Sequence, residues 1–281
     1  MTADLSWMLQ DIVQNVPRAR HAVLLSADGL PRGATEGLDA KDVGTISAAM
    51  AGMQSLSRAT AHFAGPEKDG EWSQTIIEFS HGWIFLIGAG QGAYLAAAAE
   101  PDVDMQQISF RMHRLVARLG NNLTSAPRVP TDEGAANGGG DAARQSATSG
   151  SGFVLPALDK AVAEVRGARH AVLLGGDGLP IGATAGMPRD MADTISAAMT
   201  GIHAYSRVTA QFAGDVEEPA WRQTVIEFSH GWIFLIAAGG GAFLAAAAEH
   251  DCDIEEFTTR LHEVVPDLTA QSAYGGGAAD V

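Results

Sequence analysis

Cysteine is almost absent from this chain of 281 residues, and positive charges are scarce beside negative ones. The one cysteine is Cys252, which excludes a disulfide within the chain and a cysteine-rich zinc site. Lysine and arginine number 18 against 33 aspartates and glutamates, a formal net charge of −15. An acidic chain is repelled by phosphate backbones and by anionic lipid head groups. We therefore expect no nucleic acid partner and no direct adhesion to a membrane.

Long hydrophobic runs are missing as well. The longest, such as residues 83–87 and 93–99, are too short to span a bilayer. No basic start precedes an apolar segment, as it would in a signal peptide. The sequence thus predicts a cytoplasmic protein without direct membrane insertion.

Motifs for nucleotide, metal or nucleophilic chemistry are not found either. The glycines within 88–92 lack the lysine and hydroxyl residue of a P-loop and stand between two apolar runs, which favours a hairpin over a phosphate site. No His-x-x-x-His or comparable ligand spacing is present. The serine–histidine neighbours at 80–81 and 229–230 have poor geometry for a nucleophile and its base. We expect no cofactor, no metal and no enzymatic activity of the chain itself.

What the chain does contain is a long internal repeat. Residues 18–100 align with residues 167–249 without a gap, and 53 of 83 positions are identical. A period of this length indicates a duplicated domain rather than a solenoid. The predicted organisation is a domain at 1–123, a flexible linker rich in Gly, Ser, Ala and Pro at 124–152, a second domain at 153–269 and a disordered tail at 270–281.

Each copy predicts the order helix, two strands, helix, three strands, helix (αββαβββα). Apolar residues at helical spacing over 5–16 predict the first helix, and a long second helix runs from an N-cap at Asp39 to about Phe63. The central strands are apolar on both faces, so both faces of their sheet are covered, and short connections imply antiparallel pairing. The fold class is therefore α+β, a five-stranded antiparallel sheet with helices on both faces. In the second copy, we expect Pro266 to interrupt the last helix.

Two kinds of short reversal recur in both copies. Asp-Gly pairs suit a tight turn with positive φ at glycine, and histidine before glycine tolerates the left-handed backbone better than most residues. The predicted turn residues are Asp28, Gly29, His81, Gly82, Asp177, Gly178, His230 and Gly231. Glu78 and Glu227 also recur, and we expect them to form structural ion pairs with Arg58 and Arg207 of the second helix.

A ridge of small residues runs along each second helix. A glycine inside a helix costs about 1 kcal/mol relative to alanine, so a packing reason is expected for it. Either the ridge meets a partner, or it lies on its own sheet. The candidate residues for a domain–domain or partner interface are Thr45, Ala48, Ala49, Gly52, Met53, Thr194, Ala197, Ala198, Gly201 and Ile202.

These features together resemble the roadblock/dynein light chain superfamily, in its bacterial MglB-like branch, here as a tandem duplication. The resemblance rests on the element order, the Asp-Gly-Leu-Pro turns at 28–31 and 177–180, the Ala/Gly/Met-containing second helix, and the glycine-rich segments at 90–96 and 239–245. It covers the chain apart from linker and tail. It implies that the copies pair through the second helix and third strand, giving one continuous sheet crossed by two long helices.

The resemblance also implies a function. It points to a non-enzymatic regulatory or scaffolding protein that binds a Ras-like small GTPase through an intramolecular pseudo-dimer, with a GTPase-activating or modulating role left open. A structural adaptor without nucleotide dependence and a small-molecule sensor module are the alternatives. Pairing within the chain, exchange of domains between chains and a further homo-oligomer all stay open at this point.

Overall fold

A computed structural model of the chain describes residues 5–65, 70–90, 92–120 and 154–275. The predicted linker at 124–152 lies outside these residues, as does the predicted tail from residue 276 onward. We call residues 5–120 the first copy and residues 154–275 the second copy.

The first copy follows the predicted order with one helix added. Its elements are α1 (Ser6–Asn15), β1 (Ala19–Ser26), β2 (Pro31–Ala34), α2 (Ala40–Ala59), α3 (Ala61–Ala64), β3 (Trp72–Phe79), β4 (Gly82–Gly88), β5 (Ala93–Ala99) and α4 (Met105–Gly120). The second helix ends at Ala59, earlier than predicted. Thr60 leaves the helical conformation with φ −94° and ψ 0°, and its hydroxyl donates back to the Ser57 carbonyl at 2.7 Å.

The second copy repeats this order. Its elements are α5 (Pro156–Glu164), β6 (Ala168–Gly175), β7 (Pro180–Ala183), α6 (Arg189–Val208), α7 (Ala210–Ala213), β8 (Trp221–Phe228), β9 (Gly231–Gly239), β10 (Ala242–Glu249) and α8 (Ile254–Gly275).

Helix α8 differs from the prediction in two ways. It continues through Pro266, and it extends to Gly275 where a disordered tail was expected from residue 270. A proline removes one backbone donor, but the side of α8 that packs on the sheet, with Leu261, Val264 and Leu268, continues past it.

All the strands of the described residues form one sheet, in the order β2-β1-β5-β4-β3-β8-β9-β10-β6-β7. Every neighbouring pair is antiparallel, including β3 and β8, which join the two copies. Ile76 pairs with Val225, its own equivalent in the repeat. The junction therefore has approximate two-fold symmetry.

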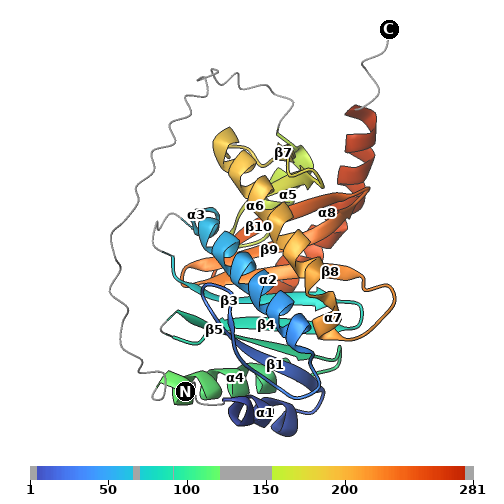
Figure 1. The fold of residues 1–281 in the computed structure, drawn as a ribbon. Helices are drawn as coiled ribbons and strands as arrows, with labels where there is room; N and C mark the ends of the chain where they lie inside the picture. Colours follow the sequence, from blue (N-terminus) through green and yellow to red (C-terminus); the bar gives the residue numbers. More distant parts are fainter. Residues whose placement is uncertain (1–4, 66–69, 91, 121–153, 276–281) are drawn as a thin grey trace, which may run out of the picture.

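Helices cover both faces of this sheet. On one face, α2 and α6 cross side by side (Figure 1) over a core that both copies share. On the other face, α1 and α4 cover the first copy, and α5 and α8 cover the second. Val23 faces the shared core while its neighbour Leu24 faces α1 and α4, as strand alternation requires.

The strand β5 shows how helices can pack closely on both faces. All its residues are buried, and four consecutive alanines occupy 96–99. Small side chains leave room for helices above and below, and β10 repeats the pattern. Among the helices of the described residues, none combines the length and apolarity that crossing a bilayer requires.

Candidate functional site: the junction of the two copies

The sheet junction carries polar contacts between the copies. Glu78 of β3 accepts a hydrogen bond from Gln223 Nε2 of β8 at 2.7 Å and pairs with Arg222 Nη1 at 3.1 Å. In the reciprocal position, Gln74 Nε2 donates to Glu227. The predicted ion pairs of these glutamates with the second helix are therefore wrong. Alternation places Glu78 on the face opposite α2.

The second contact is between α2 and α6. A Cβ atom on Gly52 would lie 2.6 Å from Cζ of Tyr205, and one on Gly201 would lie 2.6 Å from Cδ1 of Leu56. Leu56 and Tyr205 are equivalent in the repeat, so the contact is reciprocal. Each helix uses one glycine to receive a large side chain from the other.

The short helices α3 and α7 cross from one copy to the other. Phe63 of α3 stacks on His170 of β6, with ring centroids 6.5 Å apart, and Phe212 of α7 stacks on His21 of β1 at 6.3 Å. Both phenylalanines are 1% exposed. Burial of one such ring contributes about 1.5–3 kcal/mol. Sequence reasoning missed this exchange, although Thr-Ala-x-Phe-Ala-Gly is repeated at 60–65 and 209–214.

The predicted turn histidines also bond across the junction. Nε2 of His81 donates to the carbonyl of Ala210 at 3.1 Å, and Nε2 of His230 donates to the carbonyl of Ala61 at 3.0 Å. A Cβ atom on Gly65 would lie 2.2 Å from the ring of His230. These histidines thus occupy turns and fix α3 and α7 in place.

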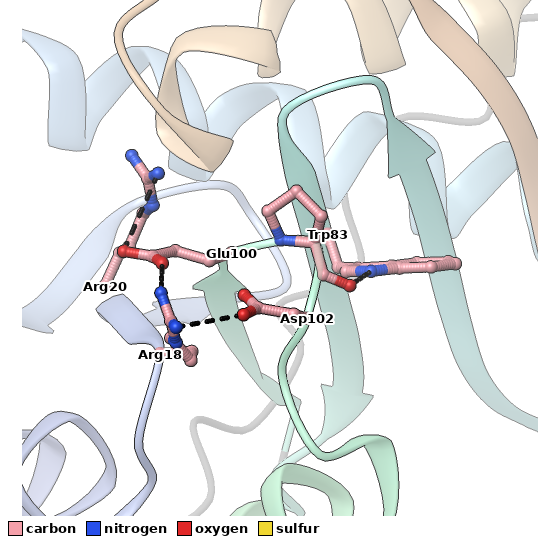
Figure 2. A network of polar contacts seen from close by, with 6 residues as sticks. Arg18, Arg20, Trp83, Glu100 and Asp102 are labelled. Carbon is pink, nitrogen blue, oxygen red and sulfur yellow. Dashed lines mark hydrogen bonds and ion pairs between the residues drawn. The ribbon is translucent and has the colours of Figure 1, made fainter.

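A charged network at the edge of the junction is seen in Figure 2. Glu100 accepts from Arg18 at 2.7 Å and lies 3.9 Å from Arg20, while Arg18 also pairs with Asp102 at 3.0 Å. Arg20 reaches the second copy, since a Cβ atom on Gly214 would lie 2.5 Å from its Nη1. The network therefore holds Arg20 against the end of α7.

Burial at the junction lowers the pKa of two histidines. Desolvation, with a smaller contribution from Arg20, lowers the pKa of His21. Desolvation, with a smaller contribution from Arg169, lowers the pKa of His170. Within the described part of the chain, Nδ1 of neither ring has a hydrogen-bond partner. A proton added there would be a buried, unpaired charge.

The ten predicted interface residues fall into three groups. Thr45, Ala48, Thr194 and Ala197 are exposed on the outer side of the helix pair. Gly52 and Gly201 lie at the contact between α2 and α6. The other four residues are buried, and they are Ala49, Met53, Ala198 and Ile202. Met53 and Ile202 lie in the core that both copies share.

The predicted Asp-Gly turns lie away from the junction. They join β1 to β2 and β6 to β7, with φ of 79° at Gly29 and 83° at Gly178. A Cβ atom on Gly29 would lie 3.1 Å from Cα of Ala48, so this turn packs closely on α2. The glycine after each turn histidine, Gly82 or Gly231, begins a strand.

A comparison with protein families decides the assignment. The profile of the Roadblock/LC7 domain matches the chain twice, at residues 5–99 and 156–248. The chain belongs to the Roadblock/LC7 domain family. Membership of this family supports a regulatory or scaffolding role.

Solved structures resemble parts of the chain. The Roadblock/LC7 domain from Streptomyces avermitilis is 31% identical, covers 44% of this chain and 100% of its own, and has a TM-score of 0.41. MglB from Myxococcus xanthus is 11% identical over 43% of this chain and 92% of its own, with a TM-score of 0.33. The gliding protein MglB from Thermus thermophilus is 18% identical, covers 42% of this chain and 88% of its own, and has a TM-score of 0.35. A search among curated proteins gave no match.

The two roadblock domains are not identical at their surfaces. In the first, a cleft of about 530 Å³ lies between α2, the start of β3 and the start of β5, bordered by Gln54, Trp72 and Tyr94. In the second, His203 replaces Gln54. The centroid of its ring lies 4.7 Å from that of Trp221 and 4.3 Å from that of Phe243. Desolvation, with a smaller contribution from Arg207, lowers the pKa of His203. The surfaces of the two domains therefore differ at this position.

Among the residues that the structure describes, no group of three His, Cys, Asp or Glu side chains is placed to hold a metal ion.

Proposed function

We propose that this chain is a regulatory or scaffolding protein without catalysis of its own that binds a Ras-like small GTPase on the face formed by α2 and α6. One observation carries the proposal. Two roadblock domains of a single chain pair through β3 and β8 and set their long helices side by side. The outer side of these helices is a composite surface that exists only while the domains are paired. A cytoplasmic location is part of this proposal.

The chemistry of this face favours a close-fitting protein partner. Thr45 and Ala48 of α2 and Thr194 and Ala197 of α6 are small and exposed. Small side chains let a partner approach the helix backbones, where the gain comes from many dispersion contacts and from apolar burial.

The charge of the face differs between its halves. Lys41, Asp42 and Gly44 of α2 correspond to Asp190, Met191 and Asp193 of α6. Asp193 is paired with Arg189 at 3.3 Å, so the second half carries a small excess of negative charge relative to the first. An asymmetric partner can therefore distinguish the two orientations that an exact homodimer would make equal. We expect one GTPase for each chain.

Regulation would work through selection of a conformation. A binder shifts the switch loops of a GTPase only by as much as its affinity for the two conformations differs. Arg58 and Arg207 stand exposed in the last turns of α2 and α6. If hydrolysis is stimulated, we expect rearrangement of the partner's own groups rather than donation of either arginine.

Binding to a panel of Ras-like GTPases, each loaded with GDP or with a non-hydrolysable GTP analogue, tests the proposal. We expect nucleotide-dependent binding that is lost in Ala48→Arg and Ala197→Arg. Ala163→Arg, an exposed alanine on α5 at the opposite side of the sheet, is the matched control and should bind normally. Binding that ignores the nucleotide would favour a structural adaptor, and no binding to any GTPase would refute the proposal. Stimulated hydrolysis that survives Arg58→Ala with Arg207→Ala would support rearrangement.

A further inference from the structure

The last helices of the two domains carry opposite charge. Helix α4 contains three arginines and no acidic residue, whereas α8 contains four carboxylates and one arginine. The reversal is position by position, since Arg114 corresponds to Glu263 and Arg118 to Asp267 in the repeat. All four of these side chains belong to exposed residues.

Two large aromatic side chains stand on the basic side. Phe110, one turn before Arg114 on α4, is 64% exposed, and Trp7 on the neighbouring helix α1 is 65% exposed. The ion pair of Arg111 with Asp11, at 3.8 Å, connects the two helices. The second copy has Thr259 and Pro156 at the equivalent positions. We call Trp7, Phe110, Arg114 and Arg118 the basic face.

The acidic counterpart lies on α8. Glu255, Glu256, Glu263 and Asp267 are exposed there, and we call them the acidic face. The first two replace Gln106 and Gln107 of α4. The hydrogen bond from Arg260 to Glu263 and then the nearby carboxylates raise the pKa of that arginine, against a smaller opposing effect of desolvation.

We propose that the basic face of one chain docks on the acidic face of a second copy of the same chain, and that the reciprocal contact closes a two-fold dimer. Both faces lie on the side of the sheet opposite α2 and α6, with α1 and α4 at one end and α5 and α8 toward the other (Figure 1). A two-fold rotation places each face on its complement and makes both contacts at once. The surface of α2 and α6 stays open on both outer sides, so this inference goes beyond the proposed function.

A second chain of this protein is favoured over other occupants because of its charge. An anionic membrane or a nucleic acid would attract the basic face but repel the acidic face on the same side of the molecule. A second chain supplies complementary charge to both faces. It also covers Trp7 and Phe110, which on a single chain stay exposed to water.

Charge-reversal variants test the dimer. Arg114→Glu with Arg118→Glu makes both faces acidic, and Glu263→Arg with Asp267→Arg makes both faces basic. Each variant breaks both contacts of a two-fold dimer, whereas an equimolar mixture of the two offers complementary faces again. We expect the native chain at low salt to sediment at twice its mass of 29.2 kDa, each variant alone to associate at least about tenfold more weakly, and the mixture to recover the dimer.

The control is the same loss of positive charge on the opposite side of the sheet. Lys41→Glu with Arg58→Glu, both on exposed residues of α2, should leave the dimer intact. A native chain that stays monomeric at low salt, open-ended growth in place of a dimer, or a mixture that does not recover would each overturn the proposal. The proposal would also be overturned if Arg114→Glu with Arg118→Glu kept the native mass but lost binding to phosphatidylserine vesicles. GTPase binding is read separately, so failure here leaves the proposed function standing.

Discussion

The phenol ring of Tyr205 occupies the space that a side chain on Gly52 would need. A Cβ atom there would lie 2.6 Å from Cζ, 2.7 Å from the hydroxyl and 2.9 Å from Cε2 of Tyr205. The helices α2 and α6 can therefore approach as closely as they do only because residue 52 has no side chain.

The first prediction compares two glycines inside α2. Replacing a helical glycine by alanine gains about 0.5–1 kcal/mol where space allows. Outside its own helix, Gly44 has no heavy atom of the described residues within 4 Å of the added Cβ, so Gly44→Ala should raise the free energy of unfolding by that amount. Gly52→Ala should lower it, because displacing Tyr205 costs about 1–3 kcal/mol.

Urea unfolding measures both variants at the same pH. Gly201→Ala should cost less than Gly52→Ala, since the obstructing atom is the flexible end of Leu56. Equal stabilisation by Gly44→Ala and Gly52→Ala would show that the helices do not meet at Gly52.

The periodicity of the sequence predicted most of the fold, because each element carries its own pattern. The apolar strands at the centre predicted a sheet covered on both faces, and the structure confirms it. Pairing of the copies through the second helix and third strand came from the family resemblance rather than from periodicity, and it is what the structure contains.

The features that the sequence did not predict depend on which residue of another element lies opposite a given side chain, and no local pattern specifies this. Phe63 continues the apolar spacing of α2, so it looked like the end of that helix rather than a ring placed on His170. Alternation could place Glu78 on one face of β3, but Arg222 becomes its neighbour only through the register of β3 on β8. The contacts that build the junction were therefore the least predictable ones.

The second prediction concerns acid. The folded protein lowers the pKa of His21 and His170 below the ordinary value of 6.5. As the pH falls below about 6.5, the unfolded chain binds protons that the folded chain does not. The contribution of these two histidines to the free energy of unfolding should therefore be complete above that pH. It should decline as the pH falls toward the lowered pKa.

The matched variants for this prediction differ in burial. His21→Gln with His170→Gln should reduce the loss of stability between pH 7.5 and pH 5.5, about one unit on either side of the histidine value. His62→Gln, at an exposed position of α3, should leave the pH dependence unchanged. If the buried pair and His62 behave alike in urea titrations, the junction histidines are not the source of the acid sensitivity.

The third prediction uses a backbone conformation that the two copies share. Arg18 has φ of 73°, and its equivalent Gly167 has φ of 81°. A side chain in this region costs roughly 1–3 kcal/mol, while the ion pairs of Arg18 are exposed to water, which screens them, so they add little stability. Arg18→Gly should therefore raise the free energy of unfolding by about 1 kcal/mol. Thermal or urea unfolding that shows a clear loss instead would mean that the network with Glu100 and Asp102 outweighs the strain.

The last prediction makes Cys252 a reporter of opening in the second copy. Burial, and then the nearby carboxylates of Asp253, Asp251 and Glu256, raise the pKa of its thiol to about 11. At pH 8 only about one thiol in a thousand is then ionised, and the thiolate is the reactive form. Labelling by a thiol-reactive disulfide should be at least about a hundredfold slower in the folded chain than in urea.

A neighbouring glycine provides the test of this reporter. A Cβ atom on Gly167 would lie 3.1 Å from both Cα and Cβ of Cys252, and φ at this residue is 81°. Gly167→Ala should therefore loosen this corner and accelerate labelling of Cys252 under native conditions. Gly186→Ala, also at positive φ but with no heavy atom of the described residues within 4 Å of its Cβ, carries similar backbone strain without the contact. If both variants accelerate labelling equally, general destabilisation controls the thiol; if Gly167→Ala alone does so, the packing of this corner holds it closed.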